Sequence, residues 1–429
     1  NYANYQEAAA EVRIARASLF PTVGATGQVT RERAGNGSPG INSGSLEGNA
    51  SWAPDLWGQV RRTIEENSAS AQASEATLAN ATLSEQIALA NAVIGVRVSD
   101  ANIDLLKATV DAYQQSLRVV QEQDRAGTVP PTDLLTARTQ LENAQASLIA
   151  LGVARAQDEH AIAVLIGRNP EELDIPHSTA LPVLPEIPAG VPSTMLQRRP
   201  DVATAERQMA AANAAIGIQI AAYYPDISLS GLVGFTQSPL AGLLKASNYV
   251  WSLGGSATET IFDGGLRSAQ VDAARASYNA AVAGYRGTVL SAFESVENDL
   301  AGLRILASQA DALDAAVRDA ARGAQIALDE YQAGTVDYTT VATAQTTLLT
   351  TRQNALSVQQ QRLLDAASLI GDLGGGWNGT LHDPLHDPLH AAPDVPTAAS
   401  EPLPTQPAAQ ATQPDSSPQT AATATTPSR

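Results

Sequence analysis

The stretch Ala126-Gly127-Thr128-Val129 recurs about 205 residues later as Ala333-Gly334-Thr335-Val336, so the chain contains an internal repeat. The segments that follow the two copies also match, LLTARTQL at 134–141 against VATAQTTL at 341–348. Two earlier landmarks pair in the same order, and four landmarks at nearly constant spacing indicate a duplication. We predict a first repeat over 1–192 and a second over 193–377. The earlier pairs are LFPTV (19–23) with YYPDI (223–227), and LWGQVR (56–61) with FDGGLR (262–267).

Each repeat contains two stretches in which apolar and polar residues alternate. In the first repeat, Val23, Ala25, Gly27 and Val29 alternate with threonine and glutamine, and a second alternating stretch follows a polar loop. Period-two alternation on both sides of such a loop is typical of a β-hairpin. Each strand has about ten residues, the length that crosses a bilayer when the strand is tilted. We predict hairpins at 20–57 and 223–263.

The rest of each repeat is predicted to be helical because proline is absent over long stretches. None occurs between Pro54 and Pro130, or between Pro239 and Pro384. A helix over 59–124 would extend about 100 Å, too long for a compact globular domain. The expected elements are long helices at 59–124 and 264–330, return helices at 132–166 and 338–371, a Pro-rich connector at 167–192, and a disordered Pro/Ala/Thr tail at 378–429.

Two hairpins supply only four strands, which is too few for a closed membrane barrel. Open strand edges are not tolerated in hydrocarbon, and closed barrels need about eight strands or more. Several chains must therefore share one barrel, and the residues themselves leave two or three copies open. The predicted fold class is mainly α with a small membrane β-barrel.

Aromatic residues gather in the two hairpin regions, although only 4% of the chain is aromatic. Membrane barrels carry such residues in girdles at the two interfaces. A soluble β-sandwich core is the alternative that the pattern leaves open. The predicted girdle residues are Phe20, Trp52, Trp57, Tyr249, Trp251 and Phe262.

The composition gives no support to an enzyme or to a nucleic-acid partner. The net charge is −18, which opposes binding to polyanions and favours cations in any water-filled passage. The chain has no cysteine, and His160 and His177 are isolated, as expected of structural residues. The motif HDPLHDPLH at 382–390 could hold a divalent metal, but its prolines prevent a helix that would align the ligands. We predict no catalytic residue, no cofactor and no metal site.

Several motifs resemble the TolC-like outer-membrane efflux family, above all its NodT-type lipoprotein branch, which serves tripartite RND pumps. The resemblance implies a homotrimer with a twelve-stranded barrel in the outer membrane of a Gram-negative bacterium, an α-helical tunnel across the periplasm, and a collar formed partly by 167–192. It also implies a periplasmic adaptor, an inner-membrane RND pump, and lipid anchoring through an N-terminal cysteine missing from this chain. The motifs are QRRPD (197–201), AER (205–207), IG (216–217), YP (224–225), LIGR (165–168), PAGVP (188–192), FDGG (262–265), ESVEN (294–298) and LGGGW (373–377).

The same resemblance places the gate and the adaptor-docking surface at the two Ala-Gly-Thr-Val turns. Family channels narrow there through acidic side chains, and this chain has Thr340 and Thr343 at those positions, so we expect a gate of different charge or tightness. Asp133 remains in the first copy. The predicted tip residues are Arg125, Gly127, Thr128, Asp133, Arg138, Gly334, Thr335, Asp337, Thr340 and Thr343.

The predicted function is a passive outer-membrane conduit that exports drugs or other small toxic compounds. A protein-secretion conduit for an ABC exporter is the nearest alternative within transport. A soluble coiled-coil scaffold is the alternative from another class, and the alternating hairpins argue against it.

Overall fold

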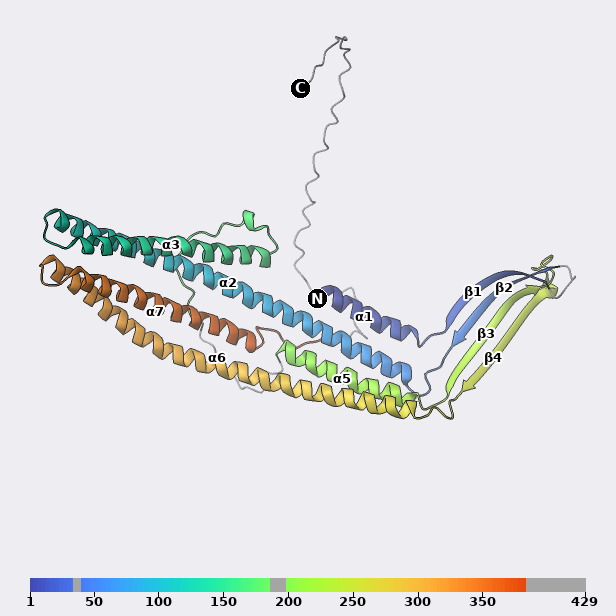
Figure 1. The fold of residues 1–429 in the computed structure, drawn as a ribbon. Helices are drawn as coiled ribbons and strands as arrows, with labels where there is room; N and C mark the ends of the chain where they lie inside the picture. Colours follow the sequence, from blue (N-terminus) through green and yellow to red (C-terminus); the bar gives the residue numbers. More distant parts are fainter. Residues whose placement is uncertain (34–39, 186–197, 383–429) are drawn as a thin grey trace, which may run out of the picture. The chain divides into compact units, whose positions relative to one another are not determined.

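The computed structural model describes residues 1–33, 40–185 and 198–382 (Figure 1). These residues are mainly helical and include four antiparallel strands, which confirms the predicted fold class. The elements, in chain order, are α1 (Tyr2–Ala17), β1 (Thr22–Glu32), β2 (Ile41–Trp52), α2 (Gln59–Arg125), α3 (Pro131–Leu165), η1 (Pro170–Glu172), α5 (Pro200–Ala221), β3 (Asp226–Gln237), η2 (Ala246–Asn248), β4 (Tyr249–Thr258), α6 (Leu266–Gln332) and α7 (Tyr338–Asp372).

The two repeats have helices of equal length at a constant spacing. Helices α2 and α6 have 67 residues each and begin 266 − 59 = 207 residues apart. Helices α3 and α7 have 35 residues each and begin 338 − 131 = 207 residues apart. Gly58 (φ 83°) and Gly265 (φ 94°) precede the long helices in the left-handed conformation, which glycine adopts without steric cost. The strands can therefore turn into the helices in the same way in both repeats.

Small side chains let the helices pack closely. Each long helix pairs with its return helix, α2 with α3 and α6 with α7, while α5 contacts both long helices and α1 contacts α2 (Figure 1). Alanine is the commonest residue at the buried positions of these helices, for example Ala71, Ala76, Ala163 and Ala214. None of the described helices is long and apolar enough to cross a membrane.

The strands form one antiparallel sheet in the order β1-β2-β3-β4. Its central pair joins the two repeats, because β2 pairs with β3 over Gly44↔Gln237 to Trp52↔Leu229. Strands β1 and β4 are the two edges, and each has one side that pairs with no other strand among the described residues.

Parts of three predicted segments lie outside the described residues. These are the loop at 34–39, the connector from 186 on together with the boundary between the repeats, and the tail from 383 on with most of the HDPLHDPLH motif.

Candidate functional site

The sheet has one apolar face and one polar face. Residues opposite each other on paired strands point to the same face, so Gly27, Leu46, Phe235 and Tyr249 share one side. The apolar face carries Val23, Ala25, Gly27, Val29, Leu46, Gly48, Ala50, Trp52, Ile227, Leu229, Gly231, Val233, Phe235, Tyr249, Trp251 and Leu253.

The opposite face is lined mainly by hydroxyl and amide side chains, with Ile41, Leu232 and Val250 as apolar exceptions. A sheet with one apolar and one polar face is suited to lipid on one side and water on the other. The polar residues are Thr22, Thr26, Gln28, Thr30, Ser45, Glu47, Asn49, Ser51, Ser228, Ser230, Thr236, Ser252, Ser256 and Thr258.

The predicted girdle residues lie at two levels of the sheet. Phe20, Trp52, Trp57 and Phe262 lie at or just beyond the strand ends that adjoin the helices, whereas Tyr249 and Trp251 lie near the opposite ends. Trp52 is opposite Leu229 and Tyr249 is opposite Phe235, so the two levels are six residues apart along β3, about 20 Å. Exposure ranges from 38% for Trp52 to 88% for Phe262.

Two of these aromatics also fasten the strand ends. The indole N–H of Trp57 donates to the carbonyl of Pro225 at 2.7 Å, and its ring stacks on Tyr224 at 4.9 Å. The indole N–H of Trp52 donates to the carbonyl of Leu19 at 3.0 Å. Trp57 therefore links the end of the first hairpin to the start of the second.

The repeated Ala-Gly-Thr-Val segments form helix-terminating turns of the Schellman type. In the first, Gly127 has φ 69° and the N–H of Thr128 donates to the carbonyl of Gln123. In the second, Gly334 has φ 74° and the N–H of Thr335 donates to the carbonyl of Glu330. In each turn, the threonine hydroxyl donates at 2.9 Å to the same carbonyl as the threonine N–H. Four of the predicted tip residues, Gly127, Thr128, Gly334 and Thr335, therefore serve to reverse the chain.

Asp133 and Asp337 lie close together where the two turns meet. Burial raises the pKa of Asp133, the neighbouring Asp337 carboxylate raises it further, and the backbone N–H of Tyr338 opposes both effects. Asp337 caps α7, because its Oδ1 accepts from the N–H of Thr340 at 3.0 Å and from its hydroxyl at 2.9 Å. These bonds hold the pKa of Asp337 below its ordinary value.

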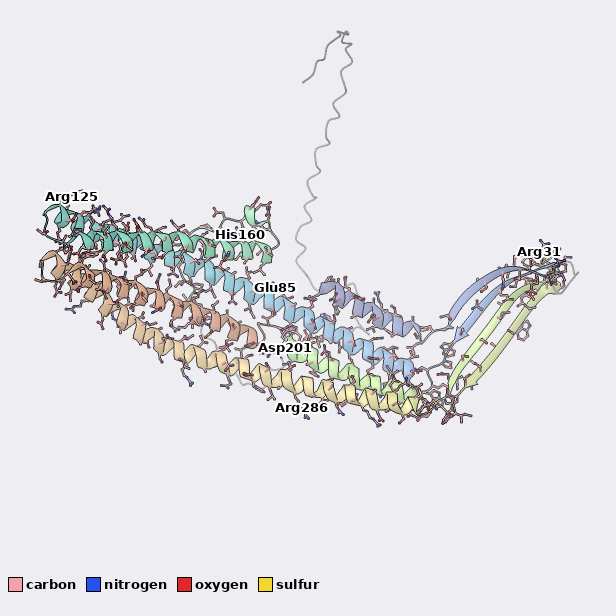
Figure 2. All side chains as sticks on the ribbon, in the orientation of Figure 1. Arg31, Glu85, Arg125, His160, Asp201 and Arg286 are labelled. Atoms are coloured by element: carbon pink, nitrogen blue, oxygen red, sulfur yellow. The ribbon has the colours of Figure 1, made fainter. Side chains whose placement is uncertain are left out.

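The remaining predicted tip residues are not joined to Asp133. Arg125 and Arg138 are exposed, and neither forms an ion pair within the described part of the chain (Figure 2 labels Arg125). The hydroxyl of Thr343 donates to the carbonyl of Thr339 within its own helix. Threonines from α3 and α7, Thr343 among them, line a groove of about 620 Å³ between these helices.

A cluster of buried side chains, which we call the tip cluster, joins the two helical hairpins and was not predicted from the sequence. Its rings, Tyr331 and Tyr338, meet edge to face at 5.4 Å. A chain of polar contacts continues from it. The Tyr338 hydroxyl donates to Gln140 Oε1 at 3.2 Å, Gln140 Nε2 to Gln345 Oε1 at 3.3 Å, and Gln345 Nε2 to Ser116 Oγ at 2.9 Å. The tip cluster comprises Val120, Ala137, Ala327, Tyr331, Tyr338 and Val341.

A second polar network fastens the start of the connector to α2 and α3. The fully buried carboxylate of Asp100 accepts from Arg155 Nε at 2.8 Å and from the N–H of Ser178 at 3.0 Å. His177 lies between two carboxylates, its Nδ1 3.0 Å from Asp100 Oδ1 and its Nε2 3.1 Å from Asp104 Oδ1. Burial alone would raise the pKa of Asp100, but the Ser178 N–H and the Arg155 guanidinium outweigh it and lower that pKa.

The Arg-Arg-Pro-Asp motif ties the start of α5 to the end of α7. Arg199 NH2 is 2.8 Å from Asp201 Oδ2, and its NH1 donates to the Asp372 carboxylate at 3.0 Å and to the Asp372 carbonyl at 2.9 Å. The motif therefore has a structural role, since a cation at a helix C-terminus satisfies free carbonyls.

Each repeat also contains a glycine of the long helix that faces an aspartate of the return helix. A Cβ at Gly95 would collide with the carboxylate of Asp158, and a Cβ at Gly302 would lie 2.7 Å from Asp365 Oδ2. Both glycines and both aspartates are 207 residues apart (302 − 95 and 365 − 158). The same close approach therefore occurs twice.

Asp299→Asn is expected to raise the thermal stability of the protein more at pH 7 than at pH 4. Burial raises the pKa of Asp299 to about 7, helped by the neighbouring carboxyls of Asp372 and Asp365. A raised pKa in the folded state means that this group supports folding fully below 3.8, and that the support is lost as pH rises through about 7.

Thermal unfolding from acidic to neutral pH measures this effect, and Asn mimics the protonated acid. The gap in Tm between variant and wild type should widen up to about pH 7 and then level off. Asp272→Asn, at a side chain that is 72% exposed, serves as the control. A gap for Asp299→Asn that does not change with pH would contradict the prediction.

Comparison with known proteins places this arrangement in one family. A family model described as outer membrane efflux protein matches residues 2–168 and 191–375. The solvent efflux pump outer membrane protein SrpC of Pseudomonas putida is 33% identical over 388 residues, which cover 87% of this chain and 81% of that protein. The cation efflux system protein CusC of Escherichia coli O6:H1 is 29% identical over 387 residues, 87% of this chain and 81% of that one.

Solved structures show the same fold. The crystal structure of CusC matches with a TM-score of 0.83 at 27% identity, covering 87% of this chain and 88% of that one. The open state of the Neisseria gonorrhoeae MtrE outer membrane channel matches with a TM-score of 0.79 at 28% identity, covering 88% and 85%. The chain is thus an outer-membrane channel component of an efflux pump, and it belongs to the outer membrane efflux protein family.

Proposed function

We propose that three copies of this chain close a twelve-stranded barrel and a continuous helical tunnel, which together form a passive, water-filled conduit. The observation that carries the proposal is the two-faced sheet. Its apolar side suits lipid and its polar side suits water. Its edge strands β1 and β4 each have a side that is unpaired among the described residues, and a neighbouring copy can satisfy it.

The conduit works with a periplasmic adaptor and an inner-membrane RND pump, which supply cargo and energy. This part of the proposal is supported by relatives named as efflux pump outer membrane proteins. Those names mention solvent and, for CusC, cation efflux. For this chain we propose small toxic compounds such as solvents or drugs as cargo, with cations favoured by the net charge of −18.

The tip serves as gate and adaptor-docking region. The tip cluster and the polar chain from Tyr338 to Ser116 hold the two hairpins of one chain together. The threonine-lined groove between α3 and α7, with the exposed Arg125 and Arg138, offers a polar surface to a partner.

Oligomer mass in detergent, combined with single-channel conductance in planar bilayers, tests the proposed function. We expect a trimer that conducts and prefers cations. A monomer without conductance would overturn the shared barrel.

A further inference from the structure

The β3–β4 loop folds over the apolar face of the sheet at the end away from the helices. Gly44 belongs to the apolar series of β2, and a Cβ there would collide with Leu240 and lie 3.7 Å from Leu243. The N–H of Leu240 donates to the carbonyl of Asn42 at 2.7 Å. The loop therefore extends the lipid-facing surface of the sheet.

Basic side chains adjoin this loop. Arg31 continues the apolar-face series of β1 and is opposite Asn42, the residue whose carbonyl the loop contacts (Figure 2 labels Arg31). Lys245 lies in the loop itself. Both are exposed, and neither forms an ion pair within the described residues. Glu32 is the only acid among residues 29–33, 40–46 and 235–251, all of which the structure describes, although the whole chain carries −18.

Large apolar side chains lie next to these cations. Leu244 is 68% exposed beside Lys245, and Tyr249 (50%) and Trp251 (71%) follow on the apolar face of β4. Toward the end of the sheet, the apolar strand residues are thus followed by the aromatic Trp251 and Tyr249 and then by the basic groups, with Leu244 beside Lys245. A membrane presents acyl chains, an interface and charged headgroups in that order.

We propose that Arg31, Lys245 and Leu244, here called the distal collar, bind a phosphate-bearing lipid of the outward-facing leaflet of the outer membrane. The two cations pair with its phosphate groups, and Leu244 inserts among its acyl chains. A lipid is favoured over a protein partner because the collar continues the apolar face of the sheet. The inference rests on the proposed function in one respect, that this face meets lipid.

Binding of lipid A to the full chain in detergent, followed by native mass spectrometry, tests the collar. Arg31→Gln with Lys245→Gln is expected to weaken binding about 25-fold, at about fivefold for each charge near the membrane surface. Arg286→Gln with Arg304→Gln removes the same charge from exposed positions of α6 and should change binding little. Leu244→Ser should weaken binding without lowering Tm, since the side chain is mostly exposed.

The proposal would be overturned by equal binding of wild type and the collar variant, by equal weakening in the α6 control, or by equally tight binding of dephosphorylated lipid A. Displacement of lipid A by inorganic phosphate at equal concentration would also overturn it, because the site would then recognise free phosphate. The single-channel conductance of the variant with both Arg31→Gln and Lys245→Gln distinguishes a failure of lipid binding from a failure of the proposed channel. A conducting variant that does not bind lipid A supports both, whereas loss of channels in the wild type would remove the proposed function.

Discussion

Asp100→Asn is expected to lower the free energy of unfolding by about 3 kcal/mol, because it removes the central charge of a buried network. The carboxylate is fully buried and accepts from Arg155, His177 and Ser178. The amide variant keeps the shape but removes the fully buried charge that faces the guanidinium of Arg155, whose side chain is only 19% exposed and which retains only the Glu159 carboxylate among the described residues. The start of the connector should then detach from α2 and α3.

Urea unfolding followed by circular dichroism gives the energy, and the rate of proteolysis in the connector reports its detachment. The lowered pKa of Asp100 means that its contribution is present above 3.8 and is lost as pH falls through the folded-state pKa. Wild type and variant should therefore converge in acid. Asp104→Asn, at a side chain that is 44% exposed, should cost much less, because solvent screens an exposed charge pair. Equal stability of Asp100→Asn and wild type at neutral pH would refute the role of this network.

Tyr338→Ala is expected to cost about 3–5 kcal/mol and to loosen the proposed gate, since it empties the centre of the tip cluster. Tyr338 is 1% exposed, packs edge to face on Tyr331 and donates to Gln140. Without its ring the α2–α3 hairpin loses its main apolar contact with α7 at the tip. The resting conductance should rise, and cells should become several-fold more sensitive to large antibiotics.

Tyr338→Phe separates packing from hydrogen bonding, because it removes only the hydroxyl. Its expected cost is about 1 kcal/mol, with a resting conductance close to that of wild type. Single-channel recording and unfolding of both variants measure the two effects. If Tyr338→Ala destabilises the protein but leaves conductance and antibiotic sensitivity unchanged, the tip cluster is structural only and the gate lies elsewhere.

Features that depend on neighbouring residues could be predicted from the sequence. The proline-free stretch predicts a helix over 59–124, and α2 spans Gln59–Arg125. The alternation in each hairpin predicts which residues share a face, since strand geometry alone fixes that relation. The turns were located from Gly127 and Gly334, whose left-handed conformation is a local requirement.

Contacts between distant helices could not be predicted in this way. Ser116, Gln140 and Gln345 come from three helices, and no pattern along the chain shows that they meet. His177 was interpreted as isolated because Asp100 and Asp104 precede it by more than seventy residues. Arg125 and Arg138 were predicted at the same tip as Asp133, and among the described residues neither forms an ion pair with it.

The paired contacts of Gly95 with Asp158 and of Gly302 with Asp365 bear on the history of the chain. Two contacts of the same kind at the same spacing are inherited most simply from a single ancestral contact that was copied when the gene duplicated. The ancestor was then a half-length polypeptide with one hairpin and one helical pair. Twice as many copies of it would have been needed to close the same tube, and the fusion of two copies let the hairpins and helices of each half diverge independently.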